Sequence, residues 1–288
     1  MFPAGVPHIR TRRVSLGNGT SLRLAEAGDP SAPPVLLLHG WGASIYMWRA
    51  WFAPLATAGR RAVAVDLPGH GLSDKPTAPD VYRLNPLVAT VRELLDRERW
   101  GSVDVVAQSM GGTIALELAL ADARVGRQVL VNPAAFGRIR LQALGRTISP
   151  AIVDLVLPRL VTRGIVARAH RLVYGDPSLI TRRDEDEYWA PSQDPSYARA
   201  MRRLLHEFQW SRPPADQMAA RLRQLRREAL VVLGTRDRLV RDSGPYAAAL
   251  RAAGAPLVVH EVTGGGHAVN EERPSEVLDL ALRFLDSA

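Results

Sequence analysis

Several short stretches of the chain are apolar at consecutive rather than alternate positions. They are Val35–Leu38, Ala62–Val65, Val103–Ala107, Gln128–Val131, Leu230–Leu233 and Leu257–Val259. Runs without alternation are typical of strands buried on both faces, as in a parallel sheet. Helical patterns lie between most of them, at 48–58, 87–97, 111–121, 245–253 and 274–285. This alternation of strands and helices predicts an α/β fold with a mainly parallel, doubly wound sheet.

The N-terminal part shows a different pattern. Positions 12–16 and 21–25 alternate between polar and apolar residues, and Gly17-Asn18-Gly19 lies between them. Glycine and asparagine supply the positive φ angles that a tight turn needs. The segment therefore predicts a β-hairpin ahead of the parallel strands.

One interval is too long for a single crossover. Residues 133–228 comprise 96 positions with several helical stretches and no convincing strand, whereas a crossover helix needs far fewer. We expect a helical cap at 138–212 on a core formed by 1–137 and 213–288. The aromatic residues of this insertion are Tyr174, Tyr188, Trp189, Tyr197, Phe208 and Trp210. They either line a cavity over the sheet or fill the core of the insertion, and we expect one or two of them to face a ligand.

A serine follows the strand pattern at 103–107 and immediately precedes a helical pattern. The motif is small-x-Ser-x-Gly, with Ala107 and Gly111 two residues before and after Ser109. Such a turn brings these two positions together, so both must be small, and it holds the serine hydroxyl above the sheet at a helix N-terminus. Glycine is usual at the first position, so Ala107 is a small departure. The motif predicts Ser109 as a nucleophile.

A second buried strand ends in His39-Gly40-Trp41-Gly42. Acyl transfer needs two N–H donors aimed at the developing oxyanion. We expect these from the backbones of Met110, which follows the nucleophile, and Trp41, whose flanking glycines let the loop turn inward. His39 is interpreted as a structural hydrogen-bonding residue rather than a base. The turn-rich loop 66–74 is interpreted as support for the site, with substrate contact as the alternative.

A serine hydroxyl needs a base, and the base needs a group that orients it. Of the seven histidines, His267 follows the last strand pattern and the flexible run Gly264–Gly266, at the strand end where ligand sites of parallel sheets gather. Two strand ends can supply the acid. Asn132 follows one and carries no charge, whereas Asp237 follows the other, with Asp242 as second choice. The sequence thus predicts a triad of Ser109, Asp237 and His267.

Composition narrows the classes of partner. The net charge is +8, but all but one of the basic residues are arginines, which are dispersed among acidic residues; we therefore expect no nucleic-acid partner. There is no cysteine, which excludes disulfides and thiolate metal sites. No apolar stretch approaches the length of a membrane span. The residues before Arg10 contain no apolar h-region, so we expect no secretory signal. We expect a cytoplasmic protein that acts on a small molecule, with an oligomeric state that the sequence leaves open.

The motifs considered together are His39–Gly42, the Asp-Leu-Pro-Gly-His-Gly-Leu-Ser loop, the Ser109 elbow, Gly-Thr-Arg-Asp at 234–237, and Gly-His at 266–267 followed by Glu-Arg-Pro at 272–274. As a set they resemble the capped α/β-hydrolase family. The resemblance runs from about Arg12 to the C-terminus. It implies a mainly parallel eight-stranded sheet, a helical cap between the strands ending at Val131 and Leu233, and no required cofactor or metal.

The expected activity is that of a serine esterase acting on a small to medium, largely apolar ester through an acyl-enzyme. Haloalkane dehalogenases and epoxide hydrolases of the family have aspartate at the nucleophile position, so Ser109 argues against them. Carbon–carbon bond hydrolases of ring-cleavage products share the serine triad and remain an alternative, although many have tryptophan after the catalytic histidine, where this chain has Ala268. A non-catalytic ligand-binding member of the fold is the third possibility.

Overall fold

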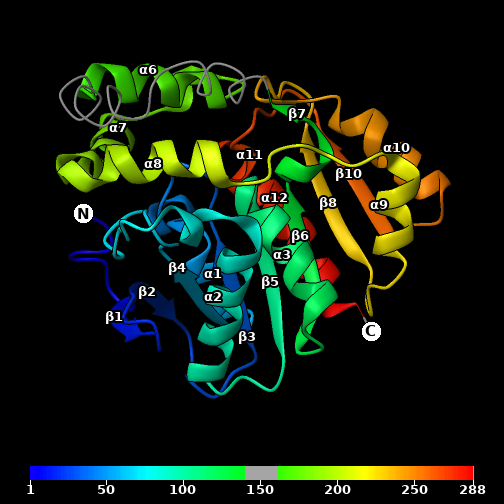
Figure 1. Cartoon of the computed structure of the whole chain (residues 1–288), viewed down its shortest axis with the longest axis horizontal. Helices are drawn as coiled ribbons and strands as arrows, with labels where there is room; N and C mark the ends of the chain where they lie inside the picture. Colours follow the sequence, from blue (N-terminus) through cyan, green and yellow to red (C-terminus); the bar gives the residue numbers. More distant parts are fainter. Residues whose placement is uncertain (140–160, 288) are drawn as a thin grey trace.

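The computed structural model describes residues 1–139 and 161–287. Eight strands form one sheet in the order β1-β2-β4-β3-β5-β6-β8-β10 (Figure 1). Their bounds are β1 (Arg10–Ser15), β2 (Ser21–Ala27), β3 (Pro34–Leu38), β4 (Arg61–Val65), β5 (Val103–Gln108), β6 (Val125–Val131), β8 (Ala229–Gly234) and β10 (Leu257–Val262). The pairs β1–β2 and β2–β4 are antiparallel and all others are parallel. The predicted mainly parallel eight-stranded α/β sheet is confirmed.

The helices flank this sheet. Those on or next to the core strands are α1 (Phe52–Thr57), α2 (Leu84–Arg97), α3 (Met110–Ala121), α9 (Ala215–Leu222), α10 (Ser243–Ala252), α11 (Val269–Glu272) and α12 (Pro274–Asp286). The short 3-10 turns are η1 (Ile45–Trp48), η2 (Pro79–Tyr82), η3 (Ala134–Phe136), η4 (Pro177–Leu179) and η5 (Ala190–Gln193).

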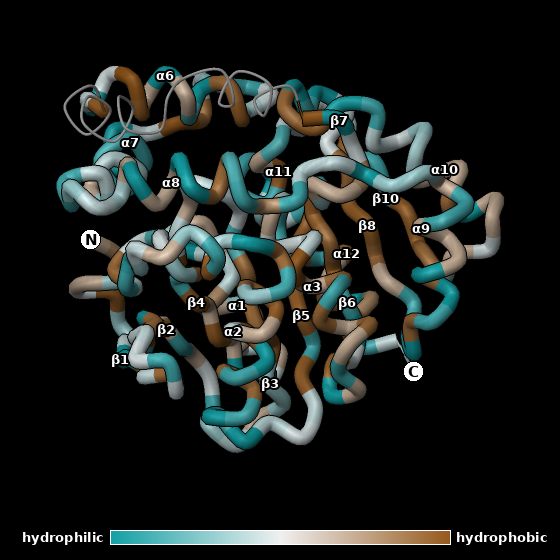
Figure 2. Tube along the Cα trace, in the orientation of Figure 1, coloured by the Kyte–Doolittle hydropathy of each residue, from teal (hydrophilic) through white to brown (hydrophobic). Residues whose placement is uncertain are grey.

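The consecutive apolar runs bury alternate residues in two separate cores. In β3, Leu36 and Leu38 join the cluster that contains α2 and α3, whereas Val35 and Leu37 join the cluster that contains α1 and α12. Figure 2 shows β5 and β8 as predominantly hydrophobic tubes in the middle of the molecule. A strand covered by helices on both faces has no polar side to expose, which is why these strands were visible in the sequence.

Two predicted elements differ in detail. The helix expected at 48–58 begins only at Phe52, because Pro54 lacks an N–H and its ring would clash with the carbonyl of a preceding helical turn; residues 45–48 form η1 instead. The run at 257–259 was interpreted as buried on both faces, but β10 is an edge strand and Val258 is 40% exposed. The exposed Val258 therefore reflects β-propensity rather than burial, whereas Leu257 is buried.

A two-residue strand, β7 (Arg138–Ile139), pairs antiparallel with β9 (Val240–Arg241). It lies in the interval expected to lack strands, and two residues are too few for a periodic signal. Arg212, at the other end of the predicted cap, donates to the carbonyl oxygens of Phe136 and Asp242, at 3.2 Å each. Both ends of the predicted cap therefore attach beside the segment that follows Asp237.

Three helices lie together over one end of the sheet: α6 (Arg163–Val173), α7 (Arg182–Trp189) and α8 (Pro195–Glu207) (Figure 1). We call these helices and the turns between them, residues 163–207, the upper layer. Residues 140–160 of the predicted cap lie outside the described residues, and the division into core 1–137 and 213–288 and cap 138–212 stays a prediction.

Candidate active site

Ser109 stands at the tight turn between β5 and α3. Its backbone has φ +52° and ψ −113°, a conformation that costs energy for any residue with a side chain. The turn is held by the Ser109 N–H, which donates to Val131 O at 3.0 Å, and by the Ser109 carbonyl, which accepts from Thr113 N and Ala134 N. A strained residue fixed on both sides by the core is the geometry that lifts a nucleophile above a sheet.

The need for small neighbours is visible in the packing. A Cβ atom on Gly111 would lie 2.5 Å from Leu38 O and 2.6 Å from His39 O. The first turn of α3 therefore presses against the end of β3. Ala107, which replaces the usual glycine, is completely buried in the core and its methyl group is accommodated there.

The loop after β3 reaches the same place. A Cβ on Gly40 would lie 2.1 Å from Gln108 Oε1 and 3.0 Å from Ser109 Cβ. Within the described residues, the backbone N–H groups of Trp41 and Met110 donate to no protein acceptor. Two unpaired N–H groups, one of them at the N-terminus of the twelve-residue α3, provide the donor set that an oxyanion requires.

The predicted base, His267, and the predicted acid, Asp237, lie within hydrogen-bonding distance of each other. His267 Nδ1 lies 2.7 Å from Asp237 Oδ2, and both side chains are over 90% buried. Asp237 Oδ1 accepts from Leu239 N at 2.8 Å and Val240 N at 3.0 Å, so the carboxylate is fixed in the loop after β8. Because an ionised carboxylate only accepts, this contact places the imidazole proton on Nδ1 and leaves Nε2 available as a base.

Ser109 and His267 are linked through Gln108, the last residue of β5, which directly precedes Ser109. Gln108 Nε2 donates to the His267 carbonyl at 3.0 Å. The Ser109 hydroxyl itself makes no hydrogen bond among the described residues, and Ser109 is 6% exposed. Catalytic hydrogen bonds are often made only once substrate is bound, so the free hydroxyl is compatible with a nucleophile.

Asn132 is a site residue whose role the sequence did not reveal. Its side chain carries no charge and so cannot serve as the acid, but it is completely buried and has φ +43°. Its Nδ2 donates to the carbonyls of Gly266 and His267, at 3.0 Å each, and its Oδ1 accepts from Gly234 N at 2.9 Å. One amide thus joins the loop that carries His267, the predicted base, to the strand that leads to Asp237, the predicted acid. The sequence feature that points to such a role is the asparagine itself at a strand end, because asparagine tolerates positive φ.

The other predicted positions have structural partners. His39 Nε2 accepts from Leu67 N at 3.0 Å, so Nδ1 carries the proton opposite Gly40 O; burial lowers the pKa of His39. In the loop 66–74, Asp66 accepts from the N–H groups of Ile45 and Leu72. These contacts support the loops around the site, as expected. Asp242 adopts a left-handed conformation at the start of α10 and faces Arg138 instead of His267.

A buried polar cluster joins α7 of the upper layer to η1 and α11. Arg49 pairs with Asp184 at 2.8 Å and with Glu271, while the Tyr46 hydroxyl donates to Asp184 at 2.7 Å and Tyr188 donates to Glu271. Burial raises the pKa of Glu271, although Arg49 and the Tyr188 hydroxyl oppose that shift.

His170, on α6, belongs to the same region. Its ring stacks on Tyr188 with centroids 4.0 Å apart, and neither ring nitrogen has a hydrogen-bond partner among the described residues. Burial lowers the pKa of His170 to about 4, against an opposing effect of Asp184.

The aromatic residues of the insertion are mainly buried. Phe208 and Trp210 pack together with ring centroids 4.7 Å apart. Tyr197 differs, because its hydroxyl donates to Gly42 O at 3.2 Å, in the loop that carries Trp41. The Trp41 indole in turn donates to Met201 O on α8 at 3.1 Å. The upper layer therefore touches the predicted oxyanion loop.

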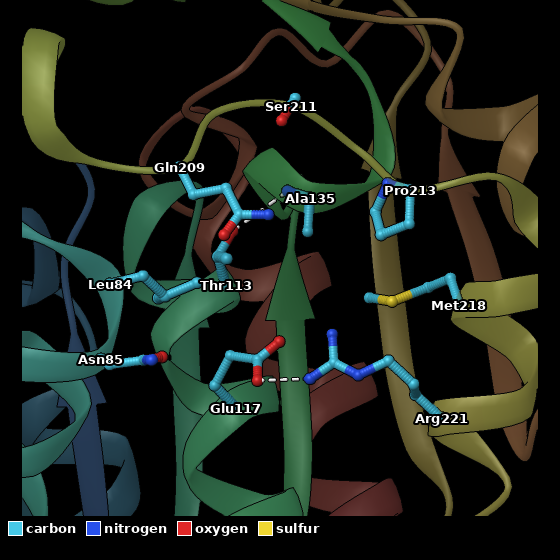
Figure 3. A pocket seen from close by; sticks show the side chains of 10 residues that line it. All are labelled: Leu84, Asn85, Thr113, Glu117, Ala135, Gln209, Ser211, Pro213, Met218 and Arg221. Carbon is cyan, nitrogen blue, oxygen red and sulfur yellow. Dashed lines mark hydrogen bonds and ion pairs between the residues drawn. The ribbon is translucent and has the colours of Figure 1, made fainter.

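A cavity of about 130 Å³ lies beside α3 (Figure 3). It is lined by Thr113 and Glu117 of α3, by Met218 and Arg221 of α9, and by residues between α8 and α9. Glu117 and Arg221 form an ion pair across it at 2.6 Å. None of the predicted triad residues lines this cavity, so it is separate from the candidate active site.

Residues 1–139 and 161–287 contain no group of three or more His, Cys, Asp or Glu side chains arranged to hold a metal ion. In the same ranges, no helix combines the length and apolarity needed to cross a lipid bilayer.

Comparison with known proteins agrees with this architecture. The model of a family described as the alpha/beta hydrolase family matches residues 35–280. The chain belongs to the α/β-hydrolase family.

Individual relatives of this hydrolase have diverse names. The dihydrolipoyllysine-residue acetyltransferase component of the acetoin cleaving system of Pseudomonas putida is 30% identical over 93% of this chain and 67% of its own length. A haloalkane dehalogenase of Mycolicibacterium paratuberculosis is 29% identical over 90% of this chain and 85% of its length. Three other relatives match over only 27% to 37% of their own length. Among solved structures, an epoxide hydrolase from an endophytic Streptomyces has a TM-score of 0.77 at 26% identity and covers 97% of this chain and 96% of that one.

Proposed function

We propose that this α/β hydrolase is a serine esterase that cleaves carboxylic esters of small to medium, largely apolar substrates. The observation that carries the proposal is the His267–Asp237 contact of 2.7 Å at the carboxyl end of the sheet where Ser109 stands strained at the N-terminus of α3. A serine, an imidazole and an orienting carboxylate brought to one end of the sheet from three distant segments are the set of groups that nucleophilic catalysis by serine requires, which supports the proposal.

The mechanism follows from the positions of these groups. His267 Nε2 takes the Ser109 proton as Oγ attacks the acyl carbon, and Asp237 stabilises the imidazolium that forms. The N–H groups of Trp41 and Met110 hold the oxyanion; each such donor contributes about 3 kcal/mol to lowering the barrier in acyl-transfer enzymes. The histidine then protonates the leaving alcohol and activates water, which releases the acid and regenerates Ser109.

The upper layer acts in this proposal as a cap. It approaches the site through Tyr197 and Met201, which contact the loop of the predicted oxyanion hole. Its remaining residues would shape the acyl pocket. No cofactor enters the mechanism, because all proton transfers are assigned to side chains of this chain.

Carbon–carbon bond hydrolysis is the second candidate, favoured by the serine at position 109, since that reaction class uses the same triad. Ala268 weighs against it. The residue is 1% exposed and offers only a methyl group next to His267.

The test is a panel of p-nitrophenyl esters of graded chain length together with a ring-cleavage dienone. We expect ester turnover with a preference for short to medium chains, and labelling by a fluorophosphonate that disappears in Ser109→Ala. Preference for the dienone would transfer the assignment to the second candidate. A folded wild-type protein that neither turns over esters nor takes the label would refute a serine hydrolase and favour a ligand-binding protein.

A further inference from the structure

The loop that carries His267 shares one carboxylate with the upper layer. Glu272 Oε1 accepts from the N–H of Gly266, the residue before His267, at 2.9 Å. Glu272 Oε2 accepts from the N–H groups of Gly175 at 2.8 Å and Asp176 at 3.3 Å, both just after α6. Glu272 is 8% exposed. A single buried side chain therefore connects the backbone next to the predicted base with the backbone of the upper layer.

The two backbones lie in direct contact at this point. A Cβ on Gly175 would lie 2.2 Å from Gly264 O, and one on Gly266 would lie 2.2 Å from Gly175 N. On the other side of His267, the Ala268 N–H donates to Val173 O, the last residue of α6, at 3.0 Å. His267 is thus flanked by a bond to the upper layer on each side, one direct and one through Glu272.

The carboxylate depends on these donors. Burial raises the pKa of Glu272, and the three backbone N–H groups act in the opposite direction by stabilising the charge. If the segment after α6 moved away, Glu272 would lose two of its three donors and would turn to water or to other partners. The remaining bond to Gly266 would then no longer be fixed in direction.

We propose that Glu272 is a positioning residue that holds His267 against Asp237 and makes this position depend on contact with the upper layer. The inference rests on the proposed function for its activity measurement only. It predicts that the site is complete when the upper layer is docked, so that a disturbance at Gly175 or Asp176 is transmitted to the imidazole without touching substrate.

The test compares Glu272→Gln with Glu276→Gln, which removes the same charge from an exposed position on α12. A glutamine at 272 keeps one oxygen but presents an NH₂ group to N–H donors on the other side, so one link is broken at nearly constant volume. We expect kcat for a p-nitrophenyl ester to fall at least tenfold in Glu272→Gln with KM within about twofold. Glu276→Gln should retain the wild-type kcat.

A spectroscopic readout addresses the imidazole directly. The low-field proton resonance of the His267 Nδ1–H, assigned by its loss in His267→Gln, should broaden or shift in Glu272→Gln and stay unchanged in Glu276→Gln. A merely structural role of Glu272 would lower the melting temperature but leave both kcat per folded molecule and this resonance at their wild-type values. That outcome would overturn the proposal.

Two further arms keep the proposal falsifiable. If Glu272→Gln does not fold, Glu272→Asp keeps the charge but is too short to reach both backbones, and the same two measurements decide. If the wild-type protein shows no esterase activity and no labelling at Ser109, the proposed function fails. The resonance still decides the inference: a change in Glu272→Gln supports it, and an unchanged signal overturns it.

Discussion

Ser109 and His267, the proposed nucleophile and base, are held in place by different kinds of interaction. Ser109 is fixed by neighbours close in the chain or in the sheet: the strand β5, the first turn of α3 and the backbone after β6. His267 is fixed by side chains from three distant segments, namely Asp237, Asn132 and Gln108, through bonds to its ring or to the backbone around it. Glu272, five residues further along the chain, holds the N–H of Gly266. A local turn can be specified by a short motif, whereas a loop tethered from several directions depends on the whole fold.

The largest effect is expected at Asp237, the proposed acid. Asp237→Asn should lower kcat by about 10⁴-fold, because an amide that donates to Nδ1 would favour the tautomer with the proton on Nε2. Esterase kinetics on the folded variant measure this effect. Asp242→Asn is the matched control and should keep wild-type activity; if instead the 242 variant were the inactive one, the acid would have been misassigned.

Asn132→Ala tests the tether beneath His267. The substitution leaves Gly266 O and Gly234 N without their partner, while His267 O keeps only the bond from Gln108. We therefore expect a loss of roughly 4 kcal/mol in the free energy of unfolding, at about 1–3 kcal/mol for each buried group left unpaired. Turnover should fall as well. Denaturant unfolding measures the loss, with Asn85→Ala on the exposed surface of α2 as control. Equal stability of the two variants would contradict the tether.

His170→Phe tests how a buried histidine of the upper layer makes the stability of the protein depend on pH. Because burial lowers the pKa of His170 from 6.5 to about 4, the unfolded chain takes up a proton at higher pH than the folded protein. Stability is therefore full above pH 6.5 and is lost as the pH falls toward 4, by roughly 3 kcal/mol for this group.

Phenylalanine keeps the stacking on Tyr188 but does not titrate. We expect the variant to lose less stability between pH 7 and 4.5 than the wild type in urea unfolding, while His8→Phe in the exposed N-terminal segment behaves as the wild type. If the free energy of unfolding fell in parallel with pH for the wild type and His170→Phe, His170 would make no contribution to the loss of stability at low pH.

Gly111→Ala probes the nucleophile side, where the effect should be the smallest in energy. The added Cβ lies 2.5 Å from Leu38 O, so the first turn of α3 must shift, at a cost of about 2 kcal/mol typical of overpacking. Gly101→Ala, where a Cβ meets no atom within 4 Å, is the control. The prediction fails if both alanine variants unfold at the same denaturant concentration.

The same contrast explains what the sequence revealed. The strands were predictable because helices cover both faces of the sheet and leave an uninterrupted apolar run. The turn at Ser109 was predictable because its steric demands fall on positions 107 and 111. His267 and Asp237 were chosen from their places after strand patterns, and the structure brings them within hydrogen-bonding distance.

The remaining interactions have no local signature. Asn132 and Glu272 bind backbone groups that are more than 90 residues away in the chain. These contacts are Asn132–Gly234, Asn132–His267 and Glu272–Gly175. No periodicity encodes such partners. The exposure of Val258 depends on β10 being last in the strand order, which is a property of the assembled sheet. The two-residue strand β7 exists only because β9 lies next to it.

The pairing of β7 with β9, together with the contacts of Arg212 to Phe136 and Asp242, brings the entry and exit of the 140–211 segment to one place. A segment whose two ends are held next to each other can differ in length or composition while the register of the strands in the sheet stays the same. Exchange of this segment between related proteins would then replace the upper layer while leaving Ser109, Asp237 and His267 on their own strands and loops.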